Sequence, residues 1–267
     1  MPARLFVELD PEAPDRARLD GAAARHLRAL RLGVGGEFRA IVGPGRERAA
    51  TLEAIGAGGA TCRLGAPIAG AGAADPVAPL VLAVAIADLA RLDLVVEKAT
   101  ELGASAILPF RAARSQRAAL PASRLARWER IARTACEQCG RTVVPAIAAP
   151  VELDELVRRL CDATDLAHAL VLSPRAEGEL LATLRERAIA RASGRGDAEA
   201  AAGVALVIGP EGGLVAAEED ALVARGAMRV GLGPRTLRVE TAAIAALALA
   251  SSWLADASPP GVSRARL

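Results

Sequence analysis

The chain has 267 residues, a length that suits two domains better than one. Hydrophobic residues make up 52% of it and can bury a sizeable core, but only 2% are aromatic, so aliphatic side chains must fill that core. The formal net charge of +2 is too small to indicate nucleic-acid binding by itself.

The first 70 residues have the pattern of strands and turns with one short helix. Polar and apolar residues alternate along Glu37–Val42, and the run ends at a turn over Gly43–Gly45. The helix is expected at about residues 20–31. Strands are predicted at Leu5–Val7, Glu37–Val42, Ala49–Ile55 and Thr61–Leu64. We therefore expect a small β-barrel in residues 1–72, with a flexible linker within residues 70–76.

From residue 73 onward, strand patterns alternate with helix patterns. Leu80–Ile86 is a continuous apolar run, as in a strand buried on both faces. Further strands are predicted at Ser105–Pro109, Ala167–Leu172, Gly203–Ile208 and Met228–Val230. Helices are predicted at Leu92–Gly103 with Gly103 as C-cap, Ser123–Cys139 with Ser123 as N-cap, Leu153–Leu160, Gly178–Ala192, Ala216–Arg225 and Val239–Leu254. The alternation predicts an α/β domain with a mostly parallel sheet over residues 73–267.

The cysteines and the short apolar runs indicate a cytoplasmic protein with reduced thiols. No secretory signal precedes the strand-like sequence at the N-terminus. The apolar runs Leu80–Ile86 and Ala242–Leu254 are too short to span a bilayer. Cys136 and Cys139 have CxxC spacing, but no further ligands with suitable spacing accompany them. We predict no metal site and interpret both cysteines as packed helix residues.

A buried strand that ends in a glycine-rich loop is the strongest local motif. The strand Val204–Ile208 runs into Gly209-Pro210-Glu211-Gly212-Gly213, and a helix follows. In open α/β sheets, ligands lie beyond the carboxyl ends of the strands, where glycines let the backbone approach them. The spacing matches neither a phosphate-binding loop nor the dinucleotide fingerprint. The alternative interpretation is a tight structural turn.

A second unit of strand, glycine loop and helix follows soon after the first. Val230 leads into Gly231-Leu232-Gly233-Pro234, and a long apolar helix begins near Val239. Glu240 suits a helix N-terminus electrostatically, whereas Arg235 and Arg238 do not. We interpret the two arginines as held there for a partner or an anion. A capped loop with solvated arginines is the alternative.

Arginines are concentrated between Arg111 and Arg141, where only Glu129 and Glu137 oppose them. A basic stripe on a near-neutral protein can bind phosphate without making the whole protein bind nucleic acid indiscriminately. Phosphate contacts of this kind would position RNA without reading its sequence. A solvated helix face is the alternative interpretation.

The two glycine loops together resemble the RsmE family of 16S rRNA (uracil-N3)-methyltransferases, which belong to the SPOUT class with a C-terminal trefoil knot. The resemblance extends along nearly the whole chain. The other matching stretches are Glu97–Gly103 with Pro109, Arg114-Ser115, Arg127-Trp128, Ala135–Gln138 with Arg141 and Pro145, and His26-Leu27 with Leu30–Leu32.

The resemblance implies an S-adenosylmethionine-dependent enzyme of rRNA processing that methylates N3 of uridine 1498 in 16S rRNA of the small ribosomal subunit. It implies a homodimer with the final helix at the interface, a PUA-like RNA-binding barrel in residues 1–72 and a knotted methyltransferase domain in residues 73–267. The implied cofactor-binding residues are Leu172, Ile208, Gly209, Pro210, Glu211, Gly212, Gly213, Gly231, Leu232, Gly233, Leu237 and Arg238. The implied RNA-binding residues are His26, Arg28, Arg31, Arg114, Arg117, Arg124, Arg127 and Arg141.

The chemistry of this reaction points to three candidate catalytic residues. Uracil N3 must lose its proton before or during attack on the methyl group, so negative charge develops on the ring. Arg238 is the first candidate to stabilise that charge. Glu240 or Glu211 is the candidate to accept the proton or to orient a group that does.

Two positions depart from the family pattern: Asp88 stands where a lysine is frequent, and Val215 where a Ser or Thr helix cap is usual.

Two other functions remain open. The first is a SPOUT methyltransferase that acts on another RNA, and the N-terminal barrel and the Glu97–Gly103 helix argue against it. The second is a non-catalytic RNA-binding or ribosome-assembly factor that keeps the fold. The intact glycines of both loops argue against the second function, because a protein without a ligand would not need them.

Overall fold

The computed structural model of the chain describes residues 2–86, 88–115, 121, 123–163, 169–192 and 203–256. The chain divides into two compact units. Unit 1 contains the residues up to Asp75 together with Arg133–Val144, and unit 2 contains Pro76–Ala132 together with Pro145–Val262. The sequence predicted a single break after residue 72, and it did not predict that Arg133–Val144 groups with the first segment.

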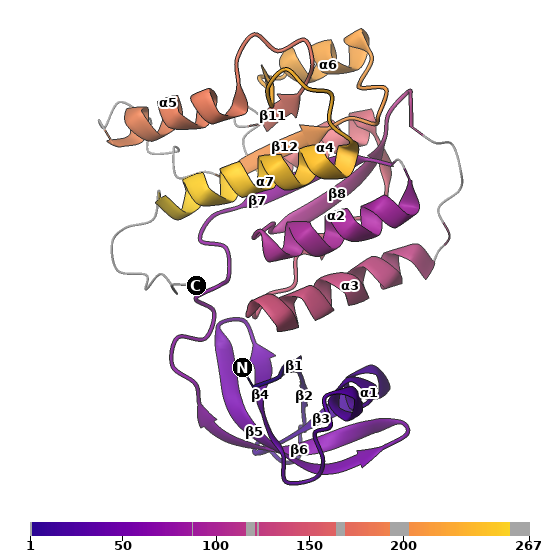
Figure 1. Cartoon of the computed structure of the whole chain (residues 1–267), viewed down its shortest axis with the longest axis vertical. Coiled ribbons are helices and arrows are strands. Elements are labelled where there is room, and N and C mark those ends of the chain that lie inside the picture. The colour runs from indigo at the N-terminus through magenta and orange to yellow at the C-terminus, as the bar shows by residue number, and fades with distance from the viewer. Residues whose placement is uncertain are drawn as a thin grey trace. The chain divides into compact units, whose positions relative to one another are not determined.

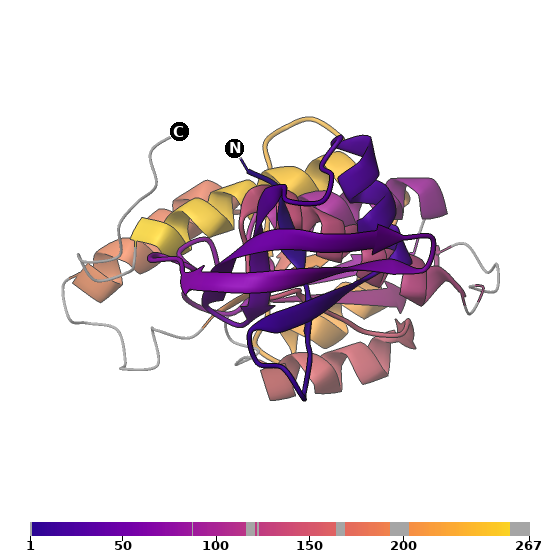
Figure 2. The same cartoon turned by 90° about the horizontal axis from the view of Figure 1, so that it is seen from below.

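Unit 1 is built on a curled six-stranded sheet. Its strands are β1 (Arg4–Phe6), β2 (Glu8–Leu9), β3 (Arg16–Asp20), β4 (Glu37–Gly43), β5 (Arg46–Gly56) and β6 (Gly59–Pro67), in the order β1-β4-β5-β6-β3-β2. β1 pairs with β4 in parallel, and the other neighbours are antiparallel. Figure 2 shows the purple strands β5 and β6 as a long pair. The predicted small β-barrel is therefore confirmed in part, as a curled sheet.

The core of unit 1 forms where alternating side chains of the sheet meet one helix. The helix α1 (Gly21–Ala29) buries Ala24 and Leu27 against the strands. Asp20 caps α1, since its carboxylate accepts a hydrogen bond from the amide of Ala23 at 2.7 Å. The largest buried side chains of this core are Leu5, Leu19, Leu27, Phe38, Leu52 and Leu64.

The segment Arg133–Val144 is held within unit 1 by polar contacts. Glu137 accepts a hydrogen bond from the amide of Phe6 at 3.1 Å, and Arg133 lies over the Phe6 ring at 4.8 Å from its centroid. The carboxylate of Asp75 accepts hydrogen bonds from the amides of Thr142 and Val143 at 2.8 and 3.0 Å. These contacts between residues distant in sequence explain why the segment belongs to this unit.

Unit 2 contains a seven-stranded sheet whose pairings, among the described residues, are all parallel. The order is β10-β8-β7-β12-β11-β13, and β9 also pairs with β8. The strands are β7 (Leu80–Ala85), β8 (Ala106–Arg111), β9 (Ala146–Ile147), β10 (Val151–Glu152), β11 (Ala169–Leu172), β12 (Val204–Ile208) and β13 (Met228–Val230). The predicted parallel sheet is therefore confirmed.

Helices cover both faces of this sheet. They are α2 (Leu89–Glu101), α3 (Ser123–Cys139, of which the residues from Arg133 on belong to unit 1), α4 (Leu153–Ala163), α5 (Leu180–Ala192), α6 (Ala216–Val223) and α7 (Val239–Asp256). On one face α7, yellow in Figure 1, packs against α2, α5, β7 and β12. On the other face α4 and α6 bury Leu156, Leu160 and Leu222 against the strands. None of the described helices is both long and apolar enough to cross a membrane.

Helix α2 begins three residues earlier than predicted, because Asp88 caps it. Its carboxylate accepts hydrogen bonds from the amides of Ala90 and Arg91 at 2.8 and 3.2 Å. The predicted glycine at the end of the helix is confirmed, since Gly103 has φ of +89° just after Leu102. Ser123, predicted to cap α3, is instead its first helical residue. Asp88 departs from the family pattern, and its capping of α2 gives it a local structural role.

Candidate functional site

Three neighbouring strands of unit 2 end side by side at the carboxyl edge of the sheet. The register pairs Leu172 of β11 with Ile208 of β12 and with Val230 of β13. The segments that follow these strands are Ser173–Ala176 and the two glycine loops at Gly209–Gly213 and Gly231–Arg238. The sequence-predicted residues Leu172, Ile208 and Gly231 therefore lie together, where ligands of parallel α/β sheets bind.

The first glycine loop, Gly209–Gly213, is a tight turn. The amide of Gly213 donates to the carbonyl of Pro210 at 2.8 Å, and Gly213 has φ of +68°. A Cβ atom on Gly209 would lie 2.9 Å from the amide nitrogen of Leu214, so only glycine fits there. The structural-turn interpretation thus accounts for Gly209 and Gly213, but not for Gly212, whose φ is ordinary.

Both loops present backbone donors that the described protein does not use. The amides of Glu211 and Gly212 donate no hydrogen bond to any described residue, and the same holds for Leu232, Thr236 and Leu237. Glu211, Gly212 and Thr236 are exposed. Free N–H groups from two adjacent loops fit a ligand rich in hydrogen-bond acceptors, such as a purine with its ribose. The local structure therefore supports ligand binding beyond what a turn requires.

The second glycine loop is attached to the start of α5 through Glu179. Glu179 forms an isolated parallel bridge with Gly231, in which the amide of Gly231 donates to the carbonyl of Gly178 at 2.8 Å. The carboxylate of Glu179 also accepts a hydrogen bond from the amide of Gly233 at 2.7 Å. A Cβ atom on Gly231 would lie 3.2 Å from both carboxylate oxygens, so this glycine lets Glu179 approach the loop.

Arg91 of α2 links the first glycine loop to the first turn of α7 electrostatically. Its Nη1 lies 3.1 Å from Oε1 of Glu211, and its Nε lies 3.9 Å from Oε1 of Glu240. Sequence reasoning missed Arg91, although it stands only three residues after Asp88, the position at which the resembled family frequently has a lysine. Among the described residues, Arg238 forms no ion pair, and its side chain is exposed.

The two candidate proton acceptors differ in access. The side chain of Glu211 is 47% exposed, whereas that of Glu240 is 14% exposed. Oε2 of Glu240 is buried and has no hydrogen-bond partner among the described residues. Glu211 is therefore the more accessible of the two carboxylates.

A buried carboxylate organises the segment that follows β11. Glu219 of α6 is 2% exposed and accepts hydrogen bonds from the hydroxyl of Ser173 at 2.9 and 3.0 Å. It pairs with Arg175 at 2.7 Å and with Arg229 of β13 at 3.0 Å. Glu219 therefore ties together α6, β13 and the residues directly after Leu172.

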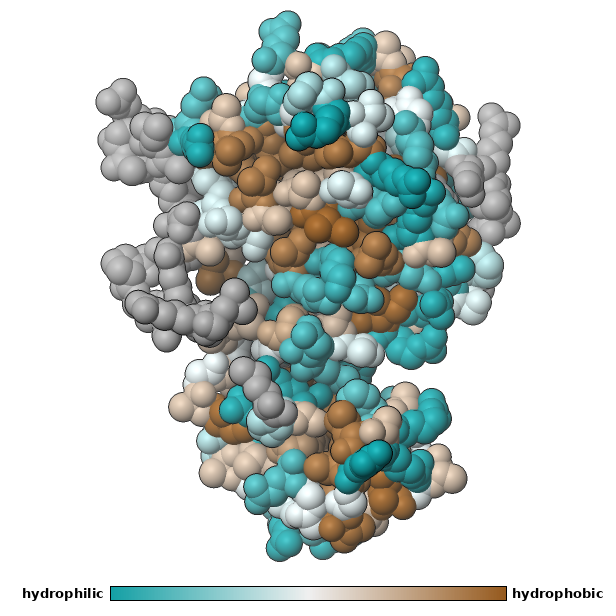
Figure 3. Space-filling view, in the orientation of Figure 1, coloured by the Kyte–Doolittle hydropathy of each residue, from teal (hydrophilic) through white to brown (hydrophobic). Residues whose placement is uncertain are grey.

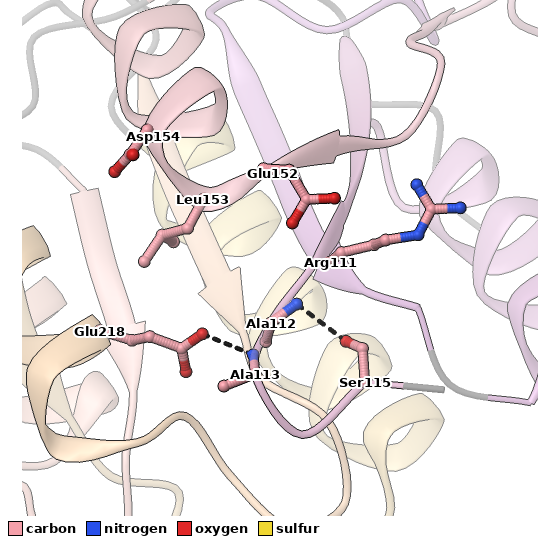
Figure 4. A pocket seen from close by; sticks show the side chains of 8 residues that line it. All are labelled: Arg111, Ala112, Ala113, Ser115, Glu152, Leu153, Asp154 and Glu218. Carbon is pink, nitrogen blue, oxygen red and sulfur yellow. Dashed lines mark hydrogen bonds between the residues drawn. The ribbon is translucent and has the colours of Figure 1, made fainter. Parts of the chain in front are cut away.

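A separate cavity lies at the carboxyl ends of β8 and β10. It has a volume of about 530 Å³. Its lining is mostly polar, and Leu153 is its one large apolar side chain (Figure 4). Its lining residues are Arg111, Ala112, Ala113, Ser115, Glu152, Leu153, Asp154 and Glu218. The sequence did not predict this cavity, because three segments distant along the chain form it.

Glu218 of this cavity compensates for the unusual Val215. Valine has no side-chain acceptor, so α6 lacks the N-cap hydrogen bond, as the sequence suggested. The carboxylate of Glu218 still accepts hydrogen bonds from the amide of Val215 at 2.9 Å and from that of Ala113 at 2.7 Å. It thereby joins the start of α6 to the loop after β8, in which Arg114 donates to the carbonyl of Gly212.

The predicted RNA-binding residues fall into distinct environments. In unit 1, His26, Arg28 and Arg31 are exposed on or just after α1. In unit 2, Arg124 and Arg127 pair with Asp93 at 3.0 and 2.8 Å, beside the indole of Trp128. Arg141 is 1% exposed, which disfavours direct contact with RNA, and Arg117 lies outside the described residues.

The cysteines form no metal site within the described residues, where no group of three or more potential ligands occurs. Burial raises the pKa of the Cys136 thiol to about 12 and that of the Cys62 thiol to about 11. A raised pKa lowers the thiolate fraction at every pH below it, and the thiolate is the reactive form. Both thiols are therefore expected to be inert in the folded protein.

Alkylation of the native protein with iodoacetamide at pH 8 is expected to leave Cys62 and Cys136 unmodified. Both should react fully once the protein is unfolded in denaturant, because their pKa values then return to the ordinary range. Peptide mapping by mass spectrometry distinguishes the sites, with the half-buried Cys139 as the internal comparison. Modification of Cys136 as fast as Cys139 in the native state would contradict this assignment.

Comparisons with known proteins show which family this chain resembles along its length. A family model described as an RNA methyltransferase domain matches residues 74–251. The ribosomal RNA small subunit methyltransferase E of Mycobacterium bovis is 34% identical, covering 97% of this chain and 96% of the relative. The protein of the same name from Bacillus subtilis is 35% identical, covering 60% of each chain.

Two solved structures with bound S-adenosylmethionine also resemble this chain. One is the ribosomal RNA small subunit methyltransferase E of Neisseria gonorrhoeae, with a TM-score of 0.76, 25% identity and coverage of 93% of this chain and 96% of that one. The other is a protein from Legionella pneumophila, with a TM-score of 0.75, 28% identity and coverage of 96% and 98%. Both likenesses extend over nearly the full length of this chain.

Proposed function

The chain belongs to the ribosomal RNA small subunit methyltransferase E family and is an S-adenosylmethionine-dependent rRNA methyltransferase, and from this we propose that it methylates N3 of a uridine, position 1498, in 16S rRNA. One observation supports this location for the reaction: in the part of the chain that the structure describes, the two glycine loops have backbone donors without partners beside the aligned ends of β11, β12 and β13. The bound cofactor supplies an electrophilic methyl group on a sulfonium.

We propose that the two loops and the end of β11 form the cofactor site. The amides of Glu211, Gly212 and Leu237 would donate hydrogen bonds to acceptor atoms of the adenosine and methionine moieties. Leu172 and Ile208, at the ends of their strands, would provide the apolar floor. Gly213 and Gly233, at φ of +68° and +85° with open space around them, keep the backbone accessible.

The protein's contribution to chemistry would be to remove a proton and to stabilise negative charge on the uracil ring. Glu211 is the accessible carboxylate beside the cofactor loops, and it is our candidate to accept the N3 proton directly or through water. Glu240 would act by holding Arg91 and Glu211 in place. Arg238, exposed in the same loop, would stabilise the developing charge on the ring oxygens.

We propose that unit 1 is a PUA-like domain that binds RNA, together with Arg114 of unit 2. His26, Arg28 and Arg31 are exposed and carry no opposing carboxylate in their own helix. Such side chains suit contact with phosphates and the edges of bases. Arg124 and Arg127 have a structural role, because both form ion pairs with Asp93. Their side chains are still 20% and 51% exposed, so each could also contact a phosphate.

We further propose a trefoil knot around the cofactor loops and a homodimer that uses α7. In support, α7 is predominantly apolar, and Ile244 and Leu249 on it are only half-buried. Figure 3 shows apolar surface over α7 and the adjoining parts of α5 and α2. Leu94 of α2 and Leu181 of α5 are 40% and 41% exposed. An apolar surface of this kind commonly marks a protein interface.

The target is tested by methylation in vitro of small-subunit particles and of naked 16S rRNA, followed by nucleoside mass spectrometry. We expect 3-methyluridine, formed only with S-adenosylmethionine present. Methyl groups on another base, or at another atom of uridine, would support the alternative of a related enzyme with a different RNA target. A protein that binds the RNA but neither S-adenosylmethionine nor S-adenosylhomocysteine would support a non-catalytic assembly factor.

A further inference from the structure

Glu179 has an unusual position for a carboxylate at the start of a helix. It directly precedes α5, and its carbonyl accepts the first hydrogen bond of that helix, from the amide of Thr183 at 3.0 Å. A carboxylate there ordinarily accepts from the next amides of its own helix. Instead, Oε2 of Glu179 accepts from the amide of Gly233, 54 residues away, at 2.7 Å. The side chain serves the second glycine loop rather than α5.

The surroundings leave the charge of Glu179 available. The residue is exposed, and no arginine or lysine among the described residues forms an ion pair with it. Both carboxylate oxygens lie 3.2 Å from the position of a Cβ atom on Gly231, directly against the backbone of the loop. Arg235 and Arg238, further along the loop, are exposed and lack partners within the described residues.

The charge of the ligand changes during methyl transfer. The sulfur of S-adenosylmethionine is a cationic sulfonium, whereas that of S-adenosylhomocysteine is a neutral thioether, and the rest of the molecule is the same. A carboxylate beside the site therefore attracts the methyl donor more than the product. If several ångströms separate the carboxylate from the sulfonium and the effective dielectric constant is high, the methyl donor should bind about three- to tenfold more tightly than the product because of this charge.

We propose that Glu179 is a specificity-determining residue of the cofactor site with two separable effects, an inference that rests on the proposed function of the two loops. Its carboxylate oxygen positions the Gly231–Arg238 loop through the amide of Gly233, which favours both ligands equally. Its negative charge favours the sulfonium over the thioether, which promotes exchange of product for fresh methyl donor. Among the described residues, Arg235 and Arg238 form no ion pair with the carboxylate, so its charge is not neutralised by direct pairing.

Two substitutions separate these effects. Glu179→Gln keeps an oxygen acceptor for the amide of Gly233 but removes the charge, whereas Glu179→Ala removes both. Calorimetric titration of the full-length protein gives the Kd of S-adenosylmethionine and of S-adenosylhomocysteine for each variant. For Glu179→Gln we expect about three- to tenfold weaker binding of the methyl donor and a change of less than about twofold for the product. For Glu179→Ala we expect weaker binding of both.

Glu177→Gln is the matched control, since Glu177 is an exposed carboxylate two residues away with no contact to the loop. It should change neither Kd by more than about twofold. Equal weakening of both ligands by Glu179→Gln would overturn the charge effect, and wild-type binding by both Glu179 variants would overturn the whole proposal. If the unsubstituted protein binds neither ligand, the proposed function itself fails, and that outcome is distinct from the others.

Discussion

Replacement of Gly212 by valine is expected to weaken the binding of S-adenosylmethionine about a hundredfold, which corresponds to about 2.7 kcal/mol. Gly212 is exposed, its φ is not in the left-handed region, and its amide is one of the unused donors. The nearest atoms to a Cβ atom there all belong to the side chain of Arg114, with Cδ at 3.1 Å and Cβ at 3.7 Å, and a small shift of that side chain makes room. The branched side chain should therefore obstruct the ligand without straining the turn.

The free energy of unfolding of this variant is expected to remain within about 1 kcal/mol of the wild-type value, because the substituted position is an exposed loop. Calorimetric titration measures the loss of binding, and urea denaturation measures stability. The matched control is Gly58→Val, at an exposed turn between β5 and β6 with no atom within 4 Å of the added Cβ and no left-handed φ. A Gly212→Val protein that unfolds much more easily than Gly58→Val would instead favour the structural-turn interpretation.

The loops could be predicted from the sequence because each carries local signals. An apolar run long enough for a buried strand precedes glycines and a proline, and a helix pattern follows. The parallel sheet that this alternation predicts then requires the strand ends to meet at one edge, as the register of Leu172, Ile208 and Val230 shows. Local composition and one rule of topology were therefore sufficient to predict that the two glycine loops follow neighbouring parallel strands.

The charged side chains around the loops could not be predicted in this way. Arg91 meets Glu211 across 120 residues of sequence, and Glu179 meets Gly233 across 54. Neither Arg91 nor Glu179 belongs to a glycine loop, and each would look like a solvated residue of a helix end. Their roles depend on how distant segments pack, which a pattern of neighbouring residues does not contain.

The elements that were missed have weak local patterns for a similar reason. β3 alternates as Arg16-Ala17-Arg18-Leu19-Asp20, but its buried positions are only an alanine and a leucine between charges. β9 and β10 have two residues each, and they form through pairing with β8 rather than through their own preference. In each case long-range pairing supplies stability that short-range composition does not reveal.

Replacement of Glu219 by alanine is expected to lower the free energy of unfolding by about 2–4 kcal/mol. The carboxylate is 2% exposed and accepts hydrogen bonds or ion pairs from Ser173, Arg175 and Arg229. Its removal leaves two guanidinium groups without their shared partner and opens a gap at the start of α6. The arginine side chains are 45% and 27% exposed, so water recovers part of the loss.

Asp220→Ala is the control that separates the effect of removing a buried carboxylate from the effect of removing a negative charge. Asp220 is the next residue and also pairs with Arg229, but its side chain is 62% exposed. Its loss should change the free energy of unfolding by less than about 1 kcal/mol, as for other exposed ion pairs. Urea denaturation of both variants provides the comparison, and equal effects would contradict the assigned role of the buried carboxylate.

The Glu219 variant should also bind S-adenosylmethionine more weakly than Asp220→Ala at a temperature where both are folded. Ser173 and Arg175 directly follow Leu172, so release of their anchor loosens the third segment of the proposed cofactor site. Glu219→Gln retains acceptor capacity for Ser173 and should lie between the two in both measurements. If Glu219→Ala loses stability but keeps full affinity, then β11 contributes to the fold and not to the preorganisation of the site.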